Sequence, residues 1–237
     1  MSRHENWHFS KQMRSTVAMF MLYESMAWTC LFRLWVCQYL VLRQSEFHAS
    51  FFCILQKHWI NMRKIKLYIA TSIDGYIARS DGDLDWLTGF PNPEKTDYGY
   101  QTLFESIDIV IMGGRTYRDI LSMDVVWPYQ AKNTYVITHH SLTEEKDIQF
   151  ITHDIVETIT QIRNENGQDI WLVGGGEIAS MLLNHELIDE MIITTVPIIL
   201  GNGIPLFSKI TKESQWEISI YHKYKNGVTQ SHYKIKR

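Results

Sequence analysis

Two glycine-rich turns contain the residues of this sequence that are best suited to binding a phosphate group. The first is Gly174-Gly175-Gly176, which follows the apolar stretch Ile170–Val173 and precedes the helically spaced segment Glu177–Leu183. A buried strand that turns through glycines into a helix presents unpaired backbone N–H groups and the positive end of the helix dipole, and both favour an anion. The alternative is a tight turn that binds nothing, so this turn alone leaves phosphate binding open.

The second turn, Gly113-Gly114, follows the short apolar stretch Asp108–Met112 and again opens a helix. Arg115 offers a planar guanidinium and Thr116 a hydroxyl group, and both suit phosphate oxygens. The alternative is an arginine on a solvated helix face and a threonine that caps the helix. Two such turns favour a dinucleotide whose phosphates lie across strand ends. Neither turn reads G-x-G-x-x-G, which disfavours a Rossmann fold.

Strand and helix patterns alternate through the middle of the chain and position these turns. Apolar or alternating runs predict strands at residues 64–71, 108–112, 134–138, 169–173 and 190–197, and helical spacing predicts helices at residues 97–106, 116–121, 154–166 and 177–183. Asn226-Gly227, between the β-rich runs 216–224 and 228–235, predicts a hairpin. We therefore expect an α/β fold with a mixed, mainly parallel sheet and a C-terminal antiparallel hairpin.

The first 61 residues differ in composition from the rest of the chain. They contain no glycine, proline or aspartate, and they carry six Lys/Arg against three Glu, net +3, whereas the remainder carries 17 Lys/Arg against 23 Asp/Glu, net −6. Their apolar stretch Val17–Leu42 is interrupted by Glu24 and Arg33, which argues against a membrane span, although a membrane anchor stays a weaker alternative. We expect residues 1–61 to be an extension of unknown structure, with non-native upstream sequence as one interpretation, and residues 62–237 to form the functional domain.

The overall charge and the cysteines exclude several partners. A formal net charge of −3 gives no indication of nucleic acid or of an anionic membrane surface. Cys30, Cys37 and Cys53 share no metal-ligand spacing, so we expect no metal. No small-residue cleavage site follows a short apolar core, which disfavours a secretory signal and favours a cytoplasmic protein. We expect a small-molecule substrate, with a homodimer as one assembly to consider.

From Met62 onward, the chain resembles the dihydrofolate reductase superfamily, and most of all the branch that includes the reductase domain of bacterial riboflavin biosynthesis. Four segments carry the resemblance in order, namely Ile69–Ala78, Met112–Tyr117, Trp171–Ile178 and Thr194–Phe207. Any one of them is a weak signal, but the set is specific. The resemblance implies a three-layer fold with helices on both faces of the sheet. It also implies hydride transfer from NADPH to a C=N or C=O bond.

The resemblance also implies which residues hold the cofactor. The two glycine turns would contact its phosphates from two sides, and Thr138 and His139 fall where the family contacts the 2′-phosphate. Gly114 stands where the family often has arginine, so the preference for NADPH over NADH stays open, with His139 or His140 as compensating residues. The full set is Ala70, Gly113, Arg115, Thr116, Thr138, His139, Gly174, Gly175, Gly176, Glu177 and Ile178.

Two carboxylates are candidates for proton management. Asp97 falls where the family has a helix that binds the ring, and partial burial against Trp86 and Tyr100 would raise its pKa and aid protonation; the alternative is that it only caps the helix. Asp74 borders the pocket in the riboflavin branch, or is a turn residue.

The substrate pocket is expected to be lined by Trp86, Tyr100 and Thr194. The alternative is that the two aromatic residues belong to the core and that the threonine is an ordinary strand residue.

The resemblance leaves two substrates open, dihydrofolate and 5-amino-6-(5-phosphoribosylamino)uracil. No zinc deaminase signature appears before the reductase segments in this sequence, so we expect a protein other than the bifunctional riboflavin enzyme. The rival hypothesis is a nucleotide-binding protein of the same fold without turnover, which would keep the glycine turns and lack a functional proton donor.

Overall fold

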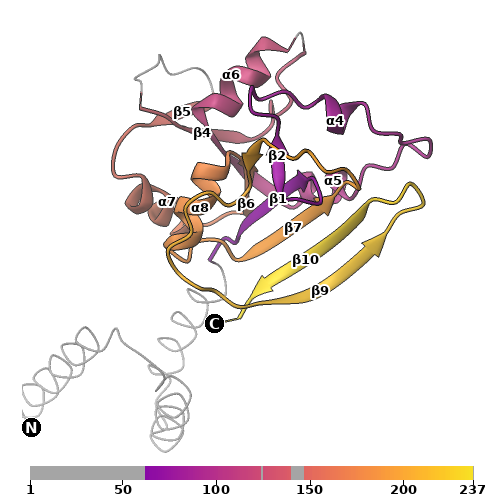
Figure 1. Cartoon of the computed structure of the whole chain (residues 1–237). Helices are drawn as coiled ribbons and strands as arrows, with labels where there is room; N and C mark the ends of the chain where they lie inside the picture. The colour runs from indigo at the N-terminus through magenta and orange to yellow at the C-terminus, as the bar shows by residue number, and fades with distance from the viewer. Residues whose placement is uncertain (1–61, 124, 140–146, 237) are drawn as a thin grey trace, which may run out of the picture. The chain divides into compact units, whose positions relative to one another are not determined.

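The computed structural model describes residues 62–123, 125–139 and 147–236 (Figure 1). The extension expected at residues 1–61, and with it the division of the chain into two parts, lies outside the described residues and stays a prediction. His140 also lies outside them. Within the described ranges, no helix has the length and apolar content that a membrane crossing requires.

Eight strands form one mixed sheet. They are β1 (Ile65–Thr71), β3 (Ile107–Gly113), β4 (Asn133–Ile137), β5 (Ile148–Ile151), β6 (Asp169–Gly174), β7 (Glu190–Thr195), β9 (Trp216–Lys223) and β10 (Thr229–Ile235). Their order is β5-β4-β3-β6-β1-β7-β10-β9, and a separate pair joins β2 (Tyr76–Ala78) to β8 (Ile204–Pro205). All neighbours from β5 to β7 are parallel, whereas β10 and β9 are antiparallel. The predicted mixed sheet and terminal hairpin are confirmed.

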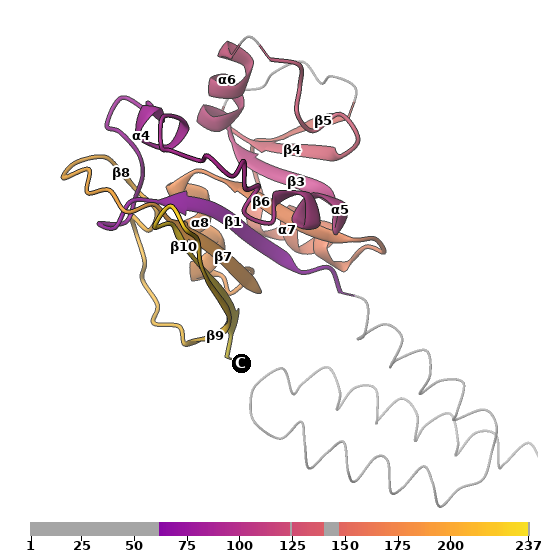
Figure 2. The same ribbon diagram turned by 90° about the vertical axis from the view of Figure 1, so that its right-hand side faces the viewer.

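Helices cover both faces of this sheet (Figure 2). They are α4 (Asp85–Thr88), α5 (Tyr100–Glu105), α6 (Gly114–Ser122), α7 (Ile155–Asn164) and α8 (Gly176–Asn184). One buried cluster joins α7 and α8 to alternate residues of the central strands, such as Ile109 and Ile111 of β3. A second cluster joins α5 and α6 to the intervening residues Val110 and Met112. Successive side chains of a strand point to opposite faces, so strands covered on both faces appear in the sequence as continuous apolar runs.

The structure corrects several predicted boundaries. The helix predicted at residues 97–106 begins at Tyr100, because Gly99 before it has a left-handed φ of 84°. The helices after the two glycine turns begin within the turns, at Gly114 and Gly176. The elements missed in the sequence, β2, α4, β5 and β8, have two to four residues each, which is too short for a reliable periodicity.

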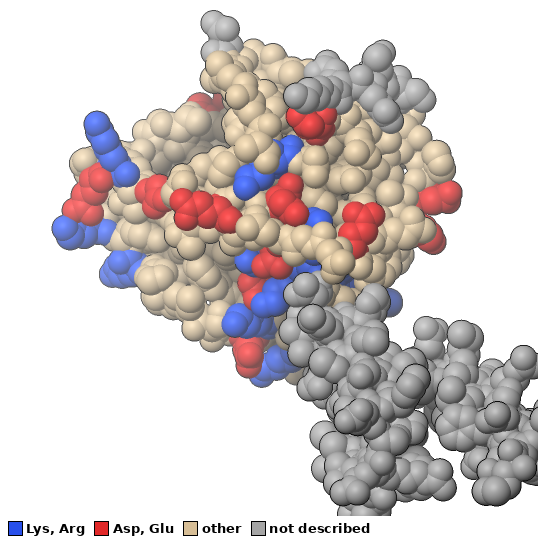
Figure 3. Space-filling model, turned by 180° about the vertical axis from the view of Figure 1, so that it is seen from behind, with Lys and Arg blue, Asp and Glu red and all other residues tan. Residues whose placement is uncertain are grey.

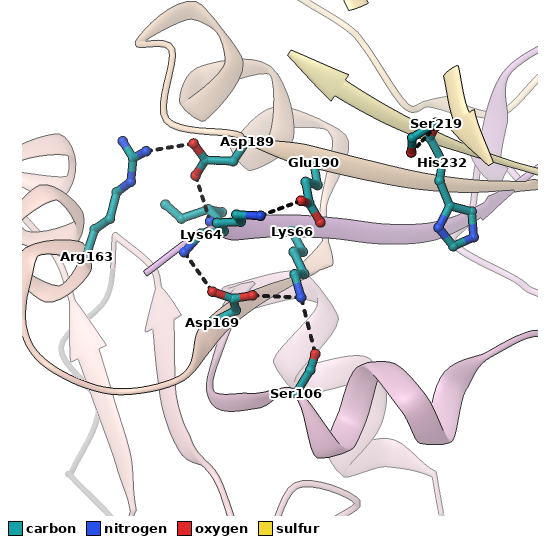
Figure 4. Close-up of polar contacts among 10 residues, drawn as sticks. Lys64, Lys66, Ser106, Arg163, Asp169, Asp189, Glu190, Ser219 and His232 are labelled. Atoms are coloured by element: carbon teal, nitrogen blue, oxygen red, sulfur yellow. Dashed lines mark hydrogen bonds and ion pairs between the residues drawn. The ribbon is translucent and has the colours of Figure 1, made fainter. Parts of the chain in front are cut away.

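Charged residues are paired where the parallel strands begin. On the face seen from behind, basic side chains lie among acidic ones (Figure 3). Four ion pairs fix the amino-terminal edge of the sheet: Arg63–Asp108 at 2.6 Å, Lys64–Glu190 at 2.8 Å, Lys66–Asp169 at 2.7 Å and Arg163–Asp189 at 2.7 Å. Figure 4 shows that the last three surround the start of β1, whose Lys64 and Ile65 N–H groups also donate to Asp169 and Asp189.

Candidate functional site

The two glycine turns lie next to each other in the folded domain. Strands β3 and β6 are parallel neighbours, with Met112 opposite Gly174, so both turns follow the carboxyl ends of adjacent strands. A Cβ atom placed on Gly113 would lie 3.3 Å from Cγ1 of Ile178, and one on Gly175 would lie 3.9 Å from Oγ1 of Thr116. The two turns therefore form one continuous surface, with α6 starting from one and α8 from the other.

Both helices begin without a capping side chain. The residues that precede them, Gly113 and Gly175, are glycines and provide no capping side chain. Arg115 is exposed in the first turn of α6, where a cation opposes the helix dipole unless an anion lies nearby. Backbone N–H groups at two helix starts, two helix dipoles and a guanidinium suit the phosphates of a dinucleotide, so the residues present fit a cofactor of this kind.

Glycine is required at this surface for two different reasons. Gly175 has a φ of 96°, which a residue with a side chain rarely adopts. A Cβ atom on Gly176 would overlap the carbonyl oxygen of Pro205, so α8 can approach β8 only through glycine.

Thr138 reaches the same surface from β4. It is buried directly beyond the end of that strand, and a Cβ atom on Gly114 would lie only 3.1 Å from its Oγ1 atom. A side chain at position 114 would therefore be in tight contact with Thr138, which favours a small residue there. His139 follows as an exposed residue, so the structure brings Thr138 to the glycine turns and leaves His139 at the rim.

A second group of candidate residues lies across β1, β7 and β10. Ala70, Thr194 and Gln230 pair in one row, so their side chains share one face of the sheet. Thr194 is buried, and its Oγ1 atom accepts a hydrogen bond of 2.8 Å from Nε2 of Gln230. Gln230 was missed in the sequence analysis. No local pattern identifies it, because it meets Thr194 only when β10 pairs with β7.

The environment of Asp97 differs from the expectation. Its side chain is exposed, and its carboxylate accepts hydrogen bonds from the N–H groups of Gly99 at 3.0 Å and Gln101 at 3.2 Å. These bonds lower the pKa of Asp97 below its usual value. The predicted partial burial and raised pKa are wrong, because the chain turns at Gly99 and directs the carboxylate to the start of α5. This contact resembles the capping alternative.

Asp74 joins two loops at the carboxyl edge of the sheet. Its carboxylate accepts hydrogen bonds from the hydroxyl of Ser72 at 2.6 Å and from the N–H groups of Leu200 and Gly201 at 3.1 and 2.7 Å. The Ser72 contact, with support from the two N–H groups, lowers the pKa of Asp74. Asp74 thus ties the loop after β1 to the loop after β7, in ionised form near neutral pH.

The two aromatic candidates have different surroundings. Tyr100 stacks on Phe104 with ring centroids 5.7 Å apart and meets the edge of Trp171 at 5.8 Å. Trp86 is 4% exposed, and its Nε1 atom has no hydrogen-bond partner among the described residues. The contacts of Tyr100 match plain aromatic packing, whereas the unpartnered N–H of Trp86 is unusual for a buried group. Their place in a substrate pocket stays a prediction.

The mixed sheet and its paired glycine turns define a protein with a dihydrofolate reductase-like fold. The chain belongs to the RibD C-terminal domain family, whose model matches residues 63–229. YwjB of Bacillus subtilis (strain 168), an uncharacterized protein, is 37% identical over 172 residues, which cover 72% of this chain and 97% of YwjB.

Two solved structures show the same fold. A protein from Shewanella sp. PV-4, provisionally assigned to riboflavin biosynthesis, is 35% identical, with a TM-score of 0.67 and coverage of 73% of this chain and 99% of its own. Dihydrofolate reductase from Enterococcus faecalis, complexed with NADP(H), is 15% identical, with a TM-score of 0.54 and coverage of 75% and 99%. The matches indicate a reductase family and confirm the expected relationship.

Proposed function

We propose that residues 62–237 form an NADPH-dependent reductase that acts on a C=N or C=O bond of a pteridine- or pyrimidine-like ring. The observation that carries the proposal is the meeting of two uncapped helix N-termini at one glycine-lined surface beside Arg115. Membership of the RibD C-terminal domain family supports it, as does the NADP(H) complex of the similarly folded dihydrofolate reductase.

In this proposal NADPH, when bound, supplies the hydride. The N–H groups at the starts of α6 and α8, with Arg115 and Thr116, hold its phosphates, and Thr138 and His139 contact the 2′-phosphate. The other candidate contacts are Ala70, Gly113, Gly174, Gly175, Gly176, Glu177 and Ile178. Because the glycines let the backbone approach closely, these contacts orient the cofactor toward the row of Ala70 and Thr194.

The ring would lie on the face of the sheet that carries Thr194, with Trp86 and Tyr100 beside it. We propose that Asp97 and Asp74 act there as ionised hydrogen-bond acceptors for ring N–H or amino groups, because hydrogen bonds lower the pKa of both. Oxygens of a carboxylate have further lone pairs beyond the N–H bonds that they already accept. This role replaces the protonated carboxyl group that the sequence led us to expect for Asp97.

One observation favours the alternative of a nucleotide-binding protein without turnover. The pKa of each catalytic candidate is lowered, and a general acid at neutral pH needs a raised one. The two hypotheses share cofactor binding and differ in whether the bound cofactor is consumed.

The decisive experiment follows NADPH oxidation by the purified protein with dihydrofolate or with 5-amino-6-(5-phosphoribosylamino)uracil. We expect one of the two to support steady turnover, and NADH in a parallel assay to show the cofactor preference. Asp97→Asn and Asp74→Asn, assayed separately, should lower kcat/KM if their carboxylates bind the ring. Saturable NADPH binding without oxidation of the cofactor in the presence of either compound would favour the alternative.

A further inference from the structure

Gln230 is a buried amide at the centre of a hydrogen-bond network. It is 2% exposed and stands among the largest fully buried side chains, which are otherwise apolar in the described part of the chain. Its Nε2 atom lies 2.8 Å from both Thr194 Oγ1 and the carbonyl oxygen of Tyr98, and its Oε1 atom lies 3.4 Å from the Tyr224 hydroxyl and 3.1 Å from His232 Nε2. The amide is therefore bonded at both ends, as burial of such a group requires.

The network assigns the orientation of the amide. The carbonyl oxygen of Tyr98 can only accept, so the atom of Gln230 that faces it must be the NH₂ group. The same NH₂ group then donates to Thr194. On the other side, Oε1 can only accept, which makes the Tyr224 hydroxyl and Nε2–H of His232 the donors. The direction of each hydrogen bond therefore follows from the Tyr98 carbonyl oxygen, which cannot donate and so fixes how the Gln230 amide is turned.

The consequence falls on the hydroxyl proton of Thr194. Within the described ranges, the hydroxyl oxygen has one hydrogen-bond partner, and that partner is a donor. The O–H is therefore left to donate to something else. Thr194 is 6% exposed, and its cross-strand neighbour on the other side is Ala70, which is only partly buried and carries no polar side-chain atom.

We propose that Gln230 is a positioning residue that holds the Thr194 hydroxyl as a hydrogen-bond donor to the bound ring. This inference rests on the proposed function and deepens it by defining the substrate class. The best-matched ring presents an acceptor at Thr194, either a carbonyl oxygen or an unprotonated ring nitrogen. A ring with an N–H at that point would leave the hydroxyl proton without a partner, at a cost in affinity.

The test measures ring binding by calorimetry with NADP⁺ present, so that no turnover occurs. The probes are dihydrofolate and 5-amino-6-(5-phosphoribosylamino)uracil. Thr194→Val should weaken binding of the accepted ring about tenfold, the scale of one lost hydrogen bond, whereas Thr194→Ser should keep it within about twofold. Gln230→Met should weaken it about fivefold by releasing the hydroxyl. The double variant should bind no more weakly than Thr194→Val alone, because Gln230 acts through that hydroxyl.

Thr195→Val is the matched control. It removes the same group from the same strand, but Thr195 pairs with Thr71 and Thr229 in the neighbouring row and faces the other side of the sheet. Ring binding by this variant should stay at the wild-type value, and NADPH affinity should be unchanged in every variant. If Gln230→Met does not fold, Gln230→Glu keeps the shape, and its ionised carboxylate would accept the Thr194 proton and weaken ring binding in the same way.

Several results would overturn the proposal. One is unchanged ring binding in Thr194→Val. Another is a loss of affinity in the double variant that equals the sum of the two single losses, because Gln230 would then act on ring binding by a route other than Thr194. Ring binding without NADPH oxidation in the wild-type protein would contradict the proposed function and leave this inference standing. Turnover that is unchanged in both Thr194→Val and Gln230→Met would support the proposed function and contradict this inference. If neither ring binds the wild-type protein, both proposals fail.

Discussion

The two edges of the parallel sheet are built in opposite ways. At the amino edge, four ion pairs lie around the first residues of β1, β3, β6 and β7. Two of their carboxylates, Asp169 and Asp189, also accept hydrogen bonds from backbone N–H groups (Figure 4). At the carboxyl edge, two helices begin without a capping side chain, and Arg115 is exposed. The first edge is closed by charge pairs, whereas the second presents two helix starts and an exposed guanidinium.

This difference separates stability from binding within one sheet. In open α/β sheets, ligands bind outside the carboxyl ends of the strands, so polar groups at that edge must stay unpaired until a ligand arrives. The opposite edge carries no such requirement and can be closed by charge pairs. We therefore expect substitutions at the amino edge to change the free energy of unfolding, and those at the carboxyl edge to change ligand affinity.

The largest effect is expected at the buried pair Arg163–Asp189, whose side chains are 11% and 10% exposed. Asp189→Ala removes the Arg163 contact and the bond from Ile65 N–H, so the free energy of unfolding should fall by about 3–5 kcal/mol. Urea denaturation measures this change. Glu186→Ala is the control, because its pair with Lys212 is exposed and 3.6 Å long, and it should cost less than about 1 kcal/mol. Equal losses of unfolding free energy in the two variants would show that the buried ion pairs of the amino edge do not stabilise the fold more than exposed pairs do.

Gly176→Ala tests how tightly the carboxyl edge is packed. The new Cβ atom would overlap the Pro205 carbonyl oxygen, so α8 and β8 must move apart, at about 1–3 kcal/mol. We also expect weaker NADPH binding, because the start of α8 is displaced. Gly113→Ala is the milder control, since its Cβ atom would meet only Cγ1 of the Ile178 side chain, at 3.3 Å. Thermal denaturation with and without NADPH measures both effects, and a Gly176→Ala protein as stable as wild type would contradict the described contact.

Arg115→Ala should affect cofactor affinity and leave the free energy of unfolding almost unchanged, the opposite of Asp189→Ala. NADPH affinity should fall by about 1–3 kcal/mol, the scale for a lost hydrogen bond to a charged group. The free energy of unfolding should change by less than about 0.5 kcal/mol, because Arg115 is an exposed surface residue. Cofactor fluorescence titration measures the affinity, with Lys223→Ala on the exposed strand β9 as the charge-matched control. An unchanged affinity would place the phosphates elsewhere.

The smallest effect concerns the acid side of the pH range. The pKa of Asp74 lies below its usual value of 3.8 in the folded protein, so its contribution to stability is present above that pH and is lost as the pH falls below it. Asp74→Asn should therefore lower the melting temperature at neutral pH, and the difference from wild type should shrink near pH 3. A difference that grows on acidification would show that the sign is wrong.

The sequence predicts the long elements and the places of the two glycine turns well. Continuous apolar runs identify the central strands, because strands covered on both faces need no alternation. The glycine turns locate the starts of α6 and α8, since glycine is needed where the backbone turns sharply or approaches another chain segment. Both signals depend only on residues close together in sequence.

The proposed substrate side depends on contacts between residues that are distant in sequence, so it was harder to predict from the sequence. Gln230 meets Tyr98 and Thr194 only after β10 pairs with β7, and no local pattern reports this. The error at Asp97 has a different origin, because two consecutive left-handed residues, Tyr98 and Gly99, turn the chain so that the carboxylate accepts hydrogen bonds from the backbone. Short elements such as α4 are fixed by tertiary contacts rather than by their own propensity.

The close approach of Gly114 to Thr138 makes these two positions interdependent in evolution and in engineering. A Cβ atom at position 114 would require Thr138 to yield by a few tenths of an ångström. Among relatives, we expect arginine at the first position to co-occur with glycine, alanine or serine at the second. We therefore expect the single substitution Gly114→Arg to crowd Thr138, and the same exchange combined with Thr138→Gly to relieve that crowding.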